Sequence, residues 1–431
     1  MINIILIFVA MVLSIRGVST LVFMLQSISW IKKNQFIKKK QEFSTKPKIT
    51  VLIPALREQK RIIPTLNHFI KYFVSRGAHI VIITTQKEYE KTFDGPSTQD
   101  VVREFVKSKK LERKITLLNY PNKSGFMAHQ LNYALNKTTD DNSFVAIYNV
   151  DSQPHPKTIE LFYNQLAKNP SAKIFQQSSA FIKNFNKFNS SNPLTNIFLQ
   201  TLALLQTRWT FAHEYARLLR QSVYKFKLFK KFANAHVVGH GLIIQIKILK
   251  EVGGFPTENI TEDLFLGYLL RSKGYSIYPL PLLELAESPA TIKSNWKQKY
   301  VWFWGPMKYW SYFKYVRKNA KMLRITDIVP SLVFTLQGLI SALAWLTSGP
   351  IVLVCLISPF VTSNLIIVLI CYIAIFVYGP LQYFIVYSNL PLFFELGGER
   401  YSKPNLLNEI YISLFSIPVT LFPDFLLLVR N

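Results

Sequence analysis

Two neighbouring carboxylates, Glu262 and Asp263, stand at the start of a predicted helix. The helical pattern continues to 273 and stops at Gly274, a residue type that commonly follows the last turn of a helix. A carboxylate at a helix start can cap the free N–H groups of the first turn. It can also accept a proton during a reaction, provided that burial or the neighbouring acid raises its pKa. Both interpretations stay open on the local sequence.

A third acidic residue, Asp151, follows a predicted strand that ends at Asn149. An Asp in this position can close a turn or cap a helix, and it can also bind a divalent cation. His155 is a candidate additional ligand. His236 and His240 flank a short apolar segment and could share a face, but a pair without a third ligand is more often structural.

These residues need a scaffold, and the alternation of apolar runs between 46 and 289 predicts one. Short β-branched runs alternate with amphipathic stretches, which indicates a mostly parallel sheet with crossover helices. The predicted strands are 49–53, 79–84, 115–119, 144–149 and 173–176, and the predicted helices include 62–76, 99–109 and 125–136. A long basic helical pattern at 193–230 fits either a membrane interface or an ordinary surface.

Apolar segments on both sides of this region predict membrane spans. Residues 2–30 can cross a bilayer as an uncleaved anchor, and further spans are predicted at about 327–348, 350–388 and 409–429. We expect two spans, or one and a re-entrant segment, within 350–388. The total is therefore about five, of which three to four are C-terminal.

The net charge of +27 gathers beside these spans, at 32–40 and at 308–324. Basic residues flanking spans indicate the cytoplasmic side and an anionic lipid surface. No nucleic-acid-binding motif is evident. The two cysteines, Cys355 and Cys371, lie in apolar runs and imply no disulfide framework.

Five motifs in a fixed order resemble those of membrane-integrated family 2 glycosyltransferases, a group that includes cellulose and hyaluronan synthases. They are the strand end Ile53-Pro54-Ala55-Leu56-Arg57-Glu58, the glycine-lysine segment 122–135, Asn149-Val150-Asp151, Thr261-Glu262-Asp263 after Gly253-Gly254-Phe255-Pro256, and Gln298 with Trp302. The resemblance implies an α/β glycosyltransferase-A fold, Rossmann-like with a mostly parallel sheet, in the cytosol. It also implies transfer of a sugar at the cell membrane, by a multi-pass protein.

The resemblance assigns roles on the donor side. The expected donor is a nucleotide-sugar, with a UDP-sugar favoured, and the expected cofactor is Mg²⁺ or Mn²⁺ bound by Asp151. The positions assigned to donor binding are Pro54, Leu56, Glu58, Thr85, Lys123, Asn149 and Asp151.

On the acceptor side, the resemblance makes Asp263 the general base, assisted by Glu262. Gln298 and Trp302 would meet the acceptor or the diphosphate. Gly239 and His240 would form the floor of the acceptor site. The expected acceptor is lipid-linked or a glycan, and the other partner is the lipid bilayer.

Three positions depart from the family pattern. Thr84-Thr85 stands where most relatives have an Asp for the nucleotide base, Asn149 replaces the first Asp of the metal motif, and Val301 replaces an arginine. Lys297 or Lys299 could supply the charge of that arginine. These changes leave an alternative, a catalytically inactive membrane partner that binds glycan or nucleotide-sugar.

The expected organisation follows the motifs along the chain. It comprises a span at 1–30, a basic linker at 31–47, a catalytic domain at 48–295, interfacial helices at 296–325 and a membrane region at 326–431.

Overall fold

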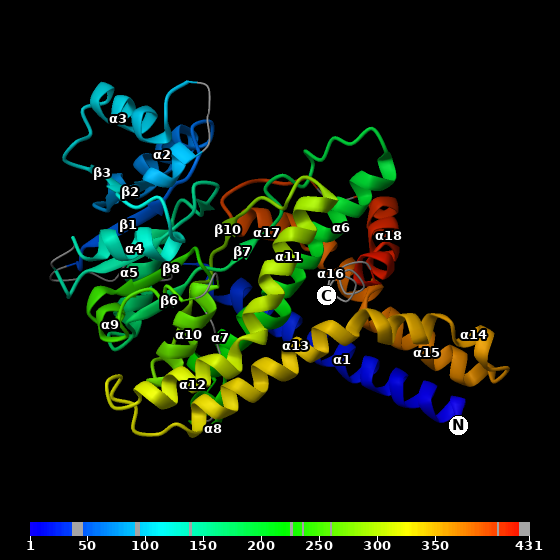
Figure 1. The fold of residues 1–431 in the computed structure, drawn as a ribbon. Coiled ribbons are helices and arrows are strands. Elements are labelled where there is room, and N and C mark those ends of the chain that lie inside the picture. The colour runs from blue at the N-terminus through cyan, green and yellow to red at the C-terminus, as the bar shows by residue number, and fades with distance from the viewer. Residues whose placement is uncertain are drawn as a thin grey trace.

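The computed structural model describes residues 1–36, 46–90, 95–137, 140–224, 227–234, 237–258, 261–402 and 405–421. An α/β domain lies on one side, and long apolar helices extend away from it (Figure 1). His236, most of the predicted basic linker and the end of the last predicted span lie outside the described residues.

A seven-stranded sheet forms the centre of the α/β domain, in the order β3-β2-β1-β4-β8-β6-β9. All neighbouring strands are parallel except β8, which runs antiparallel to both β4 and β6. The strands are β1 Ile49–Pro54, β2 His79–Thr85, β3 Ile115–Tyr120, β4 Phe144–Ile147, β6 Ile174–Gln176, β8 Leu242–Gln245 and β9 Tyr278–Pro279. The predicted mostly parallel sheet is confirmed, and five of its strands match predicted ones.

A smaller sheet of three two-residue strands adjoins it, with β10 (Glu284–Leu285) between β5 (Gln153–Pro154) and β7 (Ser179–Ala180). Strands this short have no detectable sequence period, so none of them was predicted.

Helices cover both faces of the large sheet, because side chains alternate between faces along each strand. Val51 and Ile53 of β1 pack with α2 (Ile62–Tyr72), α3 (Thr98–Ser108) and α5 (Thr158–Lys168). Leu52 packs on the opposite face with α4 (Met127–Leu135), α9 (Ile246–Glu251) and α10 (Glu262–Ser272). Both faces are therefore buried, which explains the continuous apolar runs of the strands.

The predicted helix at 193–230 is observed as α6 (Pro193–Trp209), the π-helical turn η3 (Thr210–Tyr215), α7 (Ala216–Ser222) and α8 (Lys227–Phe232). Its position differs from both expectations. Most side chains of α6, η3 and α7 are buried, and η3 packs against the first apolar helix. Helical periodicity alone did not distinguish a helix buried on several sides from an interfacial one.

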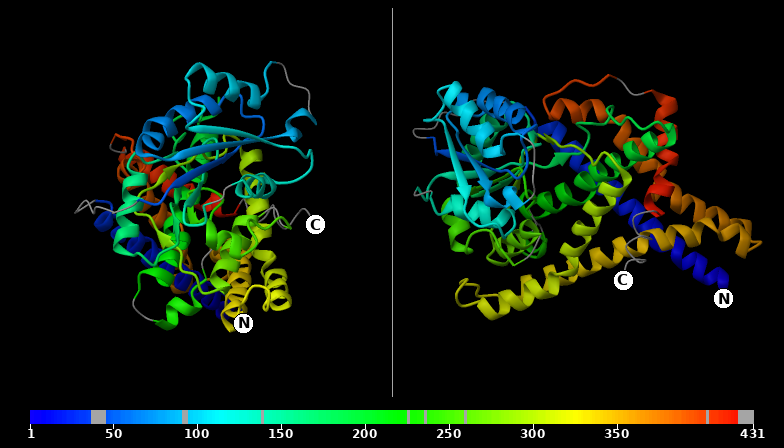
Figure 2. Two further views of the ribbon diagram at one scale, coloured as in Figure 1. Left: turned by 90° about the vertical axis from the view of Figure 1, so that its left-hand side faces the viewer. Right: turned by 45° about the horizontal axis from the view of Figure 1, so that its top comes forward.

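Among the described residues, three helices are long and apolar enough to cross a membrane: α1 (Ile2–Asn34), α13 (Val329–Leu356) and 365–388. The last consists of α15 (Leu365–Tyr378) and α16 (Pro380–Ser388). The right-hand view of Figure 2 shows α1, α13 and α15 together, away from the sheet.

The predicted span boundaries near 350 were wrong. Pro350 lies inside α13, so residues that were assigned to a separate span continue the preceding helix. A proline inside an apolar helix is tolerated where neighbouring groups satisfy the freed carbonyl. The break comes instead at α14 (Ser358–Val361). Two C-terminal helices of spanning length are therefore described rather than three to four, and the apolar helix 406–421 is shorter.

Two further helices join the domain to α13. They are α11 (Ile292–Met307) and α12 (Tyr309–Asn319). A Cβ on Gly305 of α11 would lie 2.8 Å from Leu264, so α11 approaches the start of α10 closely. Trp304 and Trp310 are exposed on the outer surface of this pair. The remaining C-terminal helices, α17 (Leu390–Leu396) and α18 (Leu406–Leu414), pack near α16.

Gly241 fixes the loop that leads into β8. It has a φ of +71°, and a Cβ there would lie 2.1 Å from the carbonyl oxygen of Gln177. Its N–H donates to Ile147 and its carbonyl accepts from Gln177. The loop therefore has no room for a side chain at this position.

We predict that Gly241→Ala lowers stability by at least about 3 kcal/mol, because backbone strain and a clash act together. Gly77→Ala is the matched control: Gly77 also has a positive φ, of +88°, but a Cβ there would meet nothing within 4 Å. Strain alone should cost it about 1 kcal/mol. Thermal unfolding in detergent compares the two, and equal shifts would contradict the role of Gly241.

Candidate active site

Asp263 occupies the first turn of α10, and two backbone N–H groups hold its carboxylate. Gly239 N–H donates to Oδ2 at 2.9 Å, and Leu264 N–H donates to Oδ1 at 2.7 Å. Burial raises the pKa of Asp263, and these hydrogen bonds and nearby His240 partly offset the rise. The carboxylate is thus fixed in position while its basicity is increased.

Glu262 is buried beside it. Burial, followed by repulsion from Asp263, raises the pKa of Glu262 to about 8. Both residues line a small pocket, together with Met127, Val238 and Gly239. At neutral pH Glu262 is therefore shifted toward its protonated form, which lowers the negative charge of the pair.

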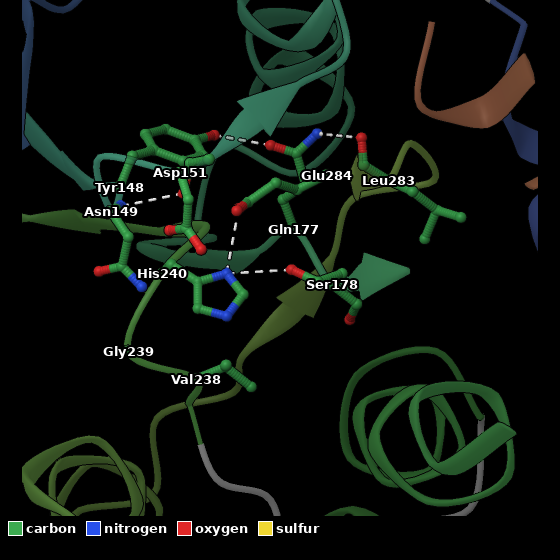
Figure 3. A network of polar contacts seen from close by, with 12 residues as sticks. Tyr148, Asn149, Asp151, Gln177, Ser178, Val238, Gly239, His240, Leu283 and Glu284 are labelled. Carbon is green, nitrogen blue, oxygen red and sulfur yellow. Dashed lines mark hydrogen bonds and ion pairs between the residues drawn. The ribbon is translucent and has the colours of Figure 1, made fainter. Parts of the chain in front are cut away.

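His240 lies in the loop before β8, and its ring faces the buried carboxylate of Glu284 (Figure 3). Its Nδ1 is 3.1 Å from Glu284 Oε2 and 3.0 Å from Ser179 Oγ. Burial lowers the pKa of His240, but Glu284, with smaller effects from Asp151 and Glu214, raises it overall to about 9. His240 is therefore a cation at neutral pH, close to the strand end that carries Asp151.

Asp151 and Asn149 follow β4 and lie beside His240 (Figure 3). The Asn149 N–H donates to Ser152 Oγ at 2.9 Å, and Lys183 Nζ donates to the Asp151 carbonyl at 3.0 Å. Both bonds use backbone atoms of Asn149 and Asp151, so they do not occupy the side-chain amide or the carboxylate.

The side chains of Asp151 and Asn149 are suitable ligands for a divalent cation whose coordination is completed by the substrate. Mg²⁺ is commonly held by one or two carboxylates, with substrate phosphates and water completing the shell. Within the described ranges, no group of three or more His, Cys, Asp or Glu is placed to hold a metal. The predicted extra ligand His155 uses its Nδ1 to accept the Lys157 N–H at 2.9 Å.

The turn after β1 lies near Asp151. Pro54 is buried, and Leu56 and Glu58 are partly exposed. Burial raises the pKa of Glu58; Arg61 opposes this and Asp151 adds to it. The structure thus brings the motif after β1 and the Asn149-Val150-Asp151 motif after β4 to one edge of the sheet, as expected for parallel strands.

Thr85 and Lys123 lie at the outer end of this edge. The Thr85 hydroxyl donates to the carbonyl of Asn122 at 3.4 Å and accepts the Lys87 N–H at 3.3 Å. Lys123 is exposed. Thr85 therefore positions the glycine-lysine segment, and its hydroxyl is already engaged by the protein.

Gln298 and Trp302 lie on α11. Gln298 Oε1 accepts from Gln206 of α6 at 2.7 Å. The Trp302 ring is 5.7 Å from that of Phe181, which is 6.5 Å from His240. Trp302 is thus linked to the His240 side of the site through one aromatic ring.

The two lysines that could replace the missing arginine differ in position. Lys299 is buried and its Nζ lies 5.9 Å from the centre of the Trp302 ring. Lys297 is exposed. Of the two lysines, Lys299 is the one that places a positive charge beside Trp302.

Sequence reasoning missed two buried carboxylates. Glu284 holds His240, and Glu214 accepts a hydrogen bond from Ser178. Burial raises the pKa of Glu214 to about 7, with Ser178 and His240 opposing the rise. Glu214 lies in the π-helical turn η3, a feature frequent at functional sites. The sequence signal that could have identified Glu214 was an acidic residue inside an apolar helical segment.

Comparison with known proteins places the chain in a family. The model of the family described as glycosyltransferase like family 2 matches residues 47–305, more than half of the chain. A curated relative, the probable glycosyltransferase YdaM of Bacillus subtilis, is 22% identical over 261 residues, which are 60% of this chain and 55% of the relative. The chain therefore spans about half the length of that relative.

Solved structures also resemble it. Mannosyltransferase PcManGT from Pyrobaculum calidifontis, in complex with GDP-Man and Mn²⁺, is 16% identical with a TM-score of 0.46, covering 85% of this chain and 98% of that one. S. aureus TarS 1–349 is 14% identical with a TM-score of 0.38, covering 88% and 90%. The family match, which spans the sheet and every motif of the site, shows that this chain belongs to the family described as glycosyltransferase like family 2.

Proposed function

We propose that the protein is an inverting glycosyltransferase that moves a sugar from a nucleotide-sugar, with a UDP-sugar favoured, to a lipid-linked or polysaccharide acceptor. The reaction takes place at the cytoplasmic face of the cell membrane, in cell-surface glycan synthesis. One observation carries the proposal. A fixed carboxylate with raised pKa, Asp263, lies near a cationic His240, which in turn lies beside Asp151.

In the proposed reaction, Asp263 takes the proton of an acceptor hydroxyl as its oxygen attacks the anomeric carbon. The bond from that carbon to the diphosphate oxygen breaks on the opposite face, so the configuration inverts and no covalent enzyme intermediate forms. The two N–H groups on Asp263 hold its oxygens in place during the transfer. Protonated Glu262 avoids a second negative charge beside the base.

The leaving diphosphate needs positive charge. Asp151, with the amide oxygen of Asn149, would hold Mg²⁺ or Mn²⁺, which when bound neutralises a diphosphate leaving group. The chain itself contributes the His240 imidazolium and buried Lys299. These two cations compensate for a metal motif reduced to one Asp.

Membrane placement supports the cytoplasmic assignment. Lys32 and Lys33 end α1, and Arg317 and Lys318 lie in the last turn of α12, shortly before α13. Both basic groups are therefore at the ends of spans that join the α/β domain. By the positive-inside rule this end faces the cytoplasm.

The first test is release of nucleoside diphosphate from UDP- and GDP-sugars by the purified protein in detergent with Mn²⁺ or Mg²⁺. Asp263→Asn should lower kcat by about 10²- to 10⁴-fold, because the base is lost. Glu104→Gln, at an exposed position of α3, is the control and should keep wild-type turnover. Equal activity of Asp263→Asn and wild type would contradict the assignment of the base.

Glu262→Gln tests the charge state of the carboxylate pair. Near pH 7 the wild-type Glu262 is mostly neutral, so we expect the variant to retain kcat/KM within about threefold. Above pH 8 the wild type gains a second negative charge beside Asp263, and the variant does not. The two pH profiles should therefore coincide below pH 7 and separate above 8. A large loss at pH 7 would show that Glu262 acts as an ion.

Metal dependence tests Asp151. We expect EDTA to stop turnover and Mn²⁺ to restore it. Asp151→Asn should raise the Mn²⁺ concentration for half-maximal rate by at least about tenfold, because a neutral amide replaces a carboxylate ligand. Asp141→Asn, at an exposed surface position, provides the control. An unchanged Mn²⁺ requirement in Asp151→Asn would exclude Asp151 as the ligand.

A further inference from the structure

A cavity of about 420 Å³ lies at the opposite end of α10 from Asp263. Its walls come from α8, from the last turn of α10 with the turn that follows, and from the loop that joins α12 to α13. These elements lie together beside the start of α13 (Figure 1). The volume falls within the range of roughly 300–1,000 Å³ that is typical of ligand sites.

Basic side chains predominate in this cavity, which we call the basic cavity. Its lining contains one carboxylate, Asp327, and the basic residues Lys230, Lys231, Arg271, Lys273 and Arg324. Lys231 Nζ lies 2.8 Å from Asp327 Oδ2, so the one acid is already paired. In the described part of the chain, the other four cations form no ion pair. A cleft lined by charges of one sign concentrates the electric field and attracts ions of the opposite sign.

Arg271 is the most deeply buried of these cations, with 3% of its surface exposed. Its Nε donates to the carbonyl of Ala233 at 3.3 Å, its Nη1 donates to that of Tyr275 at 2.8 Å, and its Nη2 donates to that of Lys230. A guanidinium group has five N–H donors, so three bonds to carbonyl groups leave two for a ligand. Burial lowers the pKa of Arg271 to about 10, so the side chain remains a cation at neutral pH.

The neighbouring Ser272 is a second buried donor. It lines the cavity and is 6% exposed, and its hydroxyl has no hydrogen-bond partner among the described residues. A buried hydroxyl without a partner costs free energy, which a ligand that accepts its hydrogen bond would recover. The C-terminal end of α10 adds a partial negative charge of about half an elementary charge, and the excess of cations outweighs it.

The basic cavity borders the start of α13, one of the helices long enough to cross a membrane. The 28 residues of α13 extend over about 42 Å, which exceeds a hydrocarbon core of roughly 30 Å. Its first turns can therefore lie at the level of the lipid headgroups. Met322, Ile328 and Val329 expose apolar side chains around the same loop. Apolar and basic side chains exposed together are typical of surfaces that contact lipid headgroups.

We propose that the basic cavity binds the phosphate of an anionic phospholipid headgroup on the domain side of the membrane. Arg271 and Ser272 provide the buried donors, and Lys230 and Arg324 provide further positive charge. This lipid is a bound partner and not the acceptor, since the cavity lies at the other end of α10 from the base. The inference therefore goes beyond the proposed function and does not depend on it.

Native mass spectrometry of the full-length protein in detergent tests the proposal without any turnover. The probes are phosphatidylglycerol, phosphatidylcholine with the same acyl chains, and inorganic phosphate. We expect phosphatidylglycerol to bind at least about tenfold more tightly than phosphatidylcholine, because choline offsets the charge of its phosphate. Inorganic phosphate should also bind at least about tenfold more weakly than phosphatidylglycerol, because it has no acyl chains to bury.

Two variants locate the binding in the cavity. Arg324→Gln and Lys230→Gln remove charges that are not fully buried, so the fold should be retained. Each should lower the preference for phosphatidylglycerol over phosphatidylcholine by about fivefold. The matched control is Arg317→Gln, which removes the same charge from an exposed position of α12 outside the cavity. It should leave the preference unchanged within about twofold, because exposed charges at a distance are screened.

Three results would overturn the inference. Equal binding of phosphatidylglycerol and phosphatidylcholine to the wild type would show that no negative headgroup is recognised, and this comparison does not depend on the folding of a variant. Equal losses in Arg324→Gln and Arg317→Gln would indicate a diffuse basic surface in place of the cavity. Inorganic phosphate that binds as tightly as phosphatidylglycerol would assign the cavity to a soluble phosphate compound.

Discussion

The hydrogen bond from Gly239 N–H to the Asp263 carboxylate joins the two halves of the site. One half is the loop before β8, which Gly241 holds against Gln177, and the other is the first turn of α10. A buried carboxylate is costly unless N–H groups satisfy it, so the loop and the helix are stable only in this mutual arrangement. His240, Glu284 and the pocket wall take their positions from the same loop.

The charge of the site depends on how burial and neighbouring groups shift the pKa of each residue, and not only on the number of acidic residues. Glu262 is shifted toward its neutral form, with a pKa of about 8, whereas Glu284 keeps His240 charged. The site therefore presents one carboxylate held by two N–H groups and one cationic histidine at neutral pH. Such preorganised charges contribute to catalysis because they require no rearrangement when charge develops in the transition state.

The largely buried helix α6–η3–α7 contacts several parts of the molecule. It supplies Glu214 to the small sheet, Gln206 to α11 and Arg208 to α16. The π-helical turn lies at the centre of this helix, and its Glu214 accepts a hydrogen bond from Ser178 beside the small sheet. The same helix therefore connects the small sheet, α11 and the apolar helix α16.

The sequence by itself determined the sheet, the apolar helices and the order of the motifs, because periodicity and local propensity encode these features over short stretches. It also predicted Asp151 and Asp263 as site residues, because their neighbours form recognisable patterns. Only the tertiary structure decided that 193–222 is largely buried, that α13 continues through Pro350, and that Glu284 is the partner of His240. These outcomes depend on contacts between residues far apart in the chain, and the packing energies and electric fields that such contacts create leave no periodic trace in the sequence.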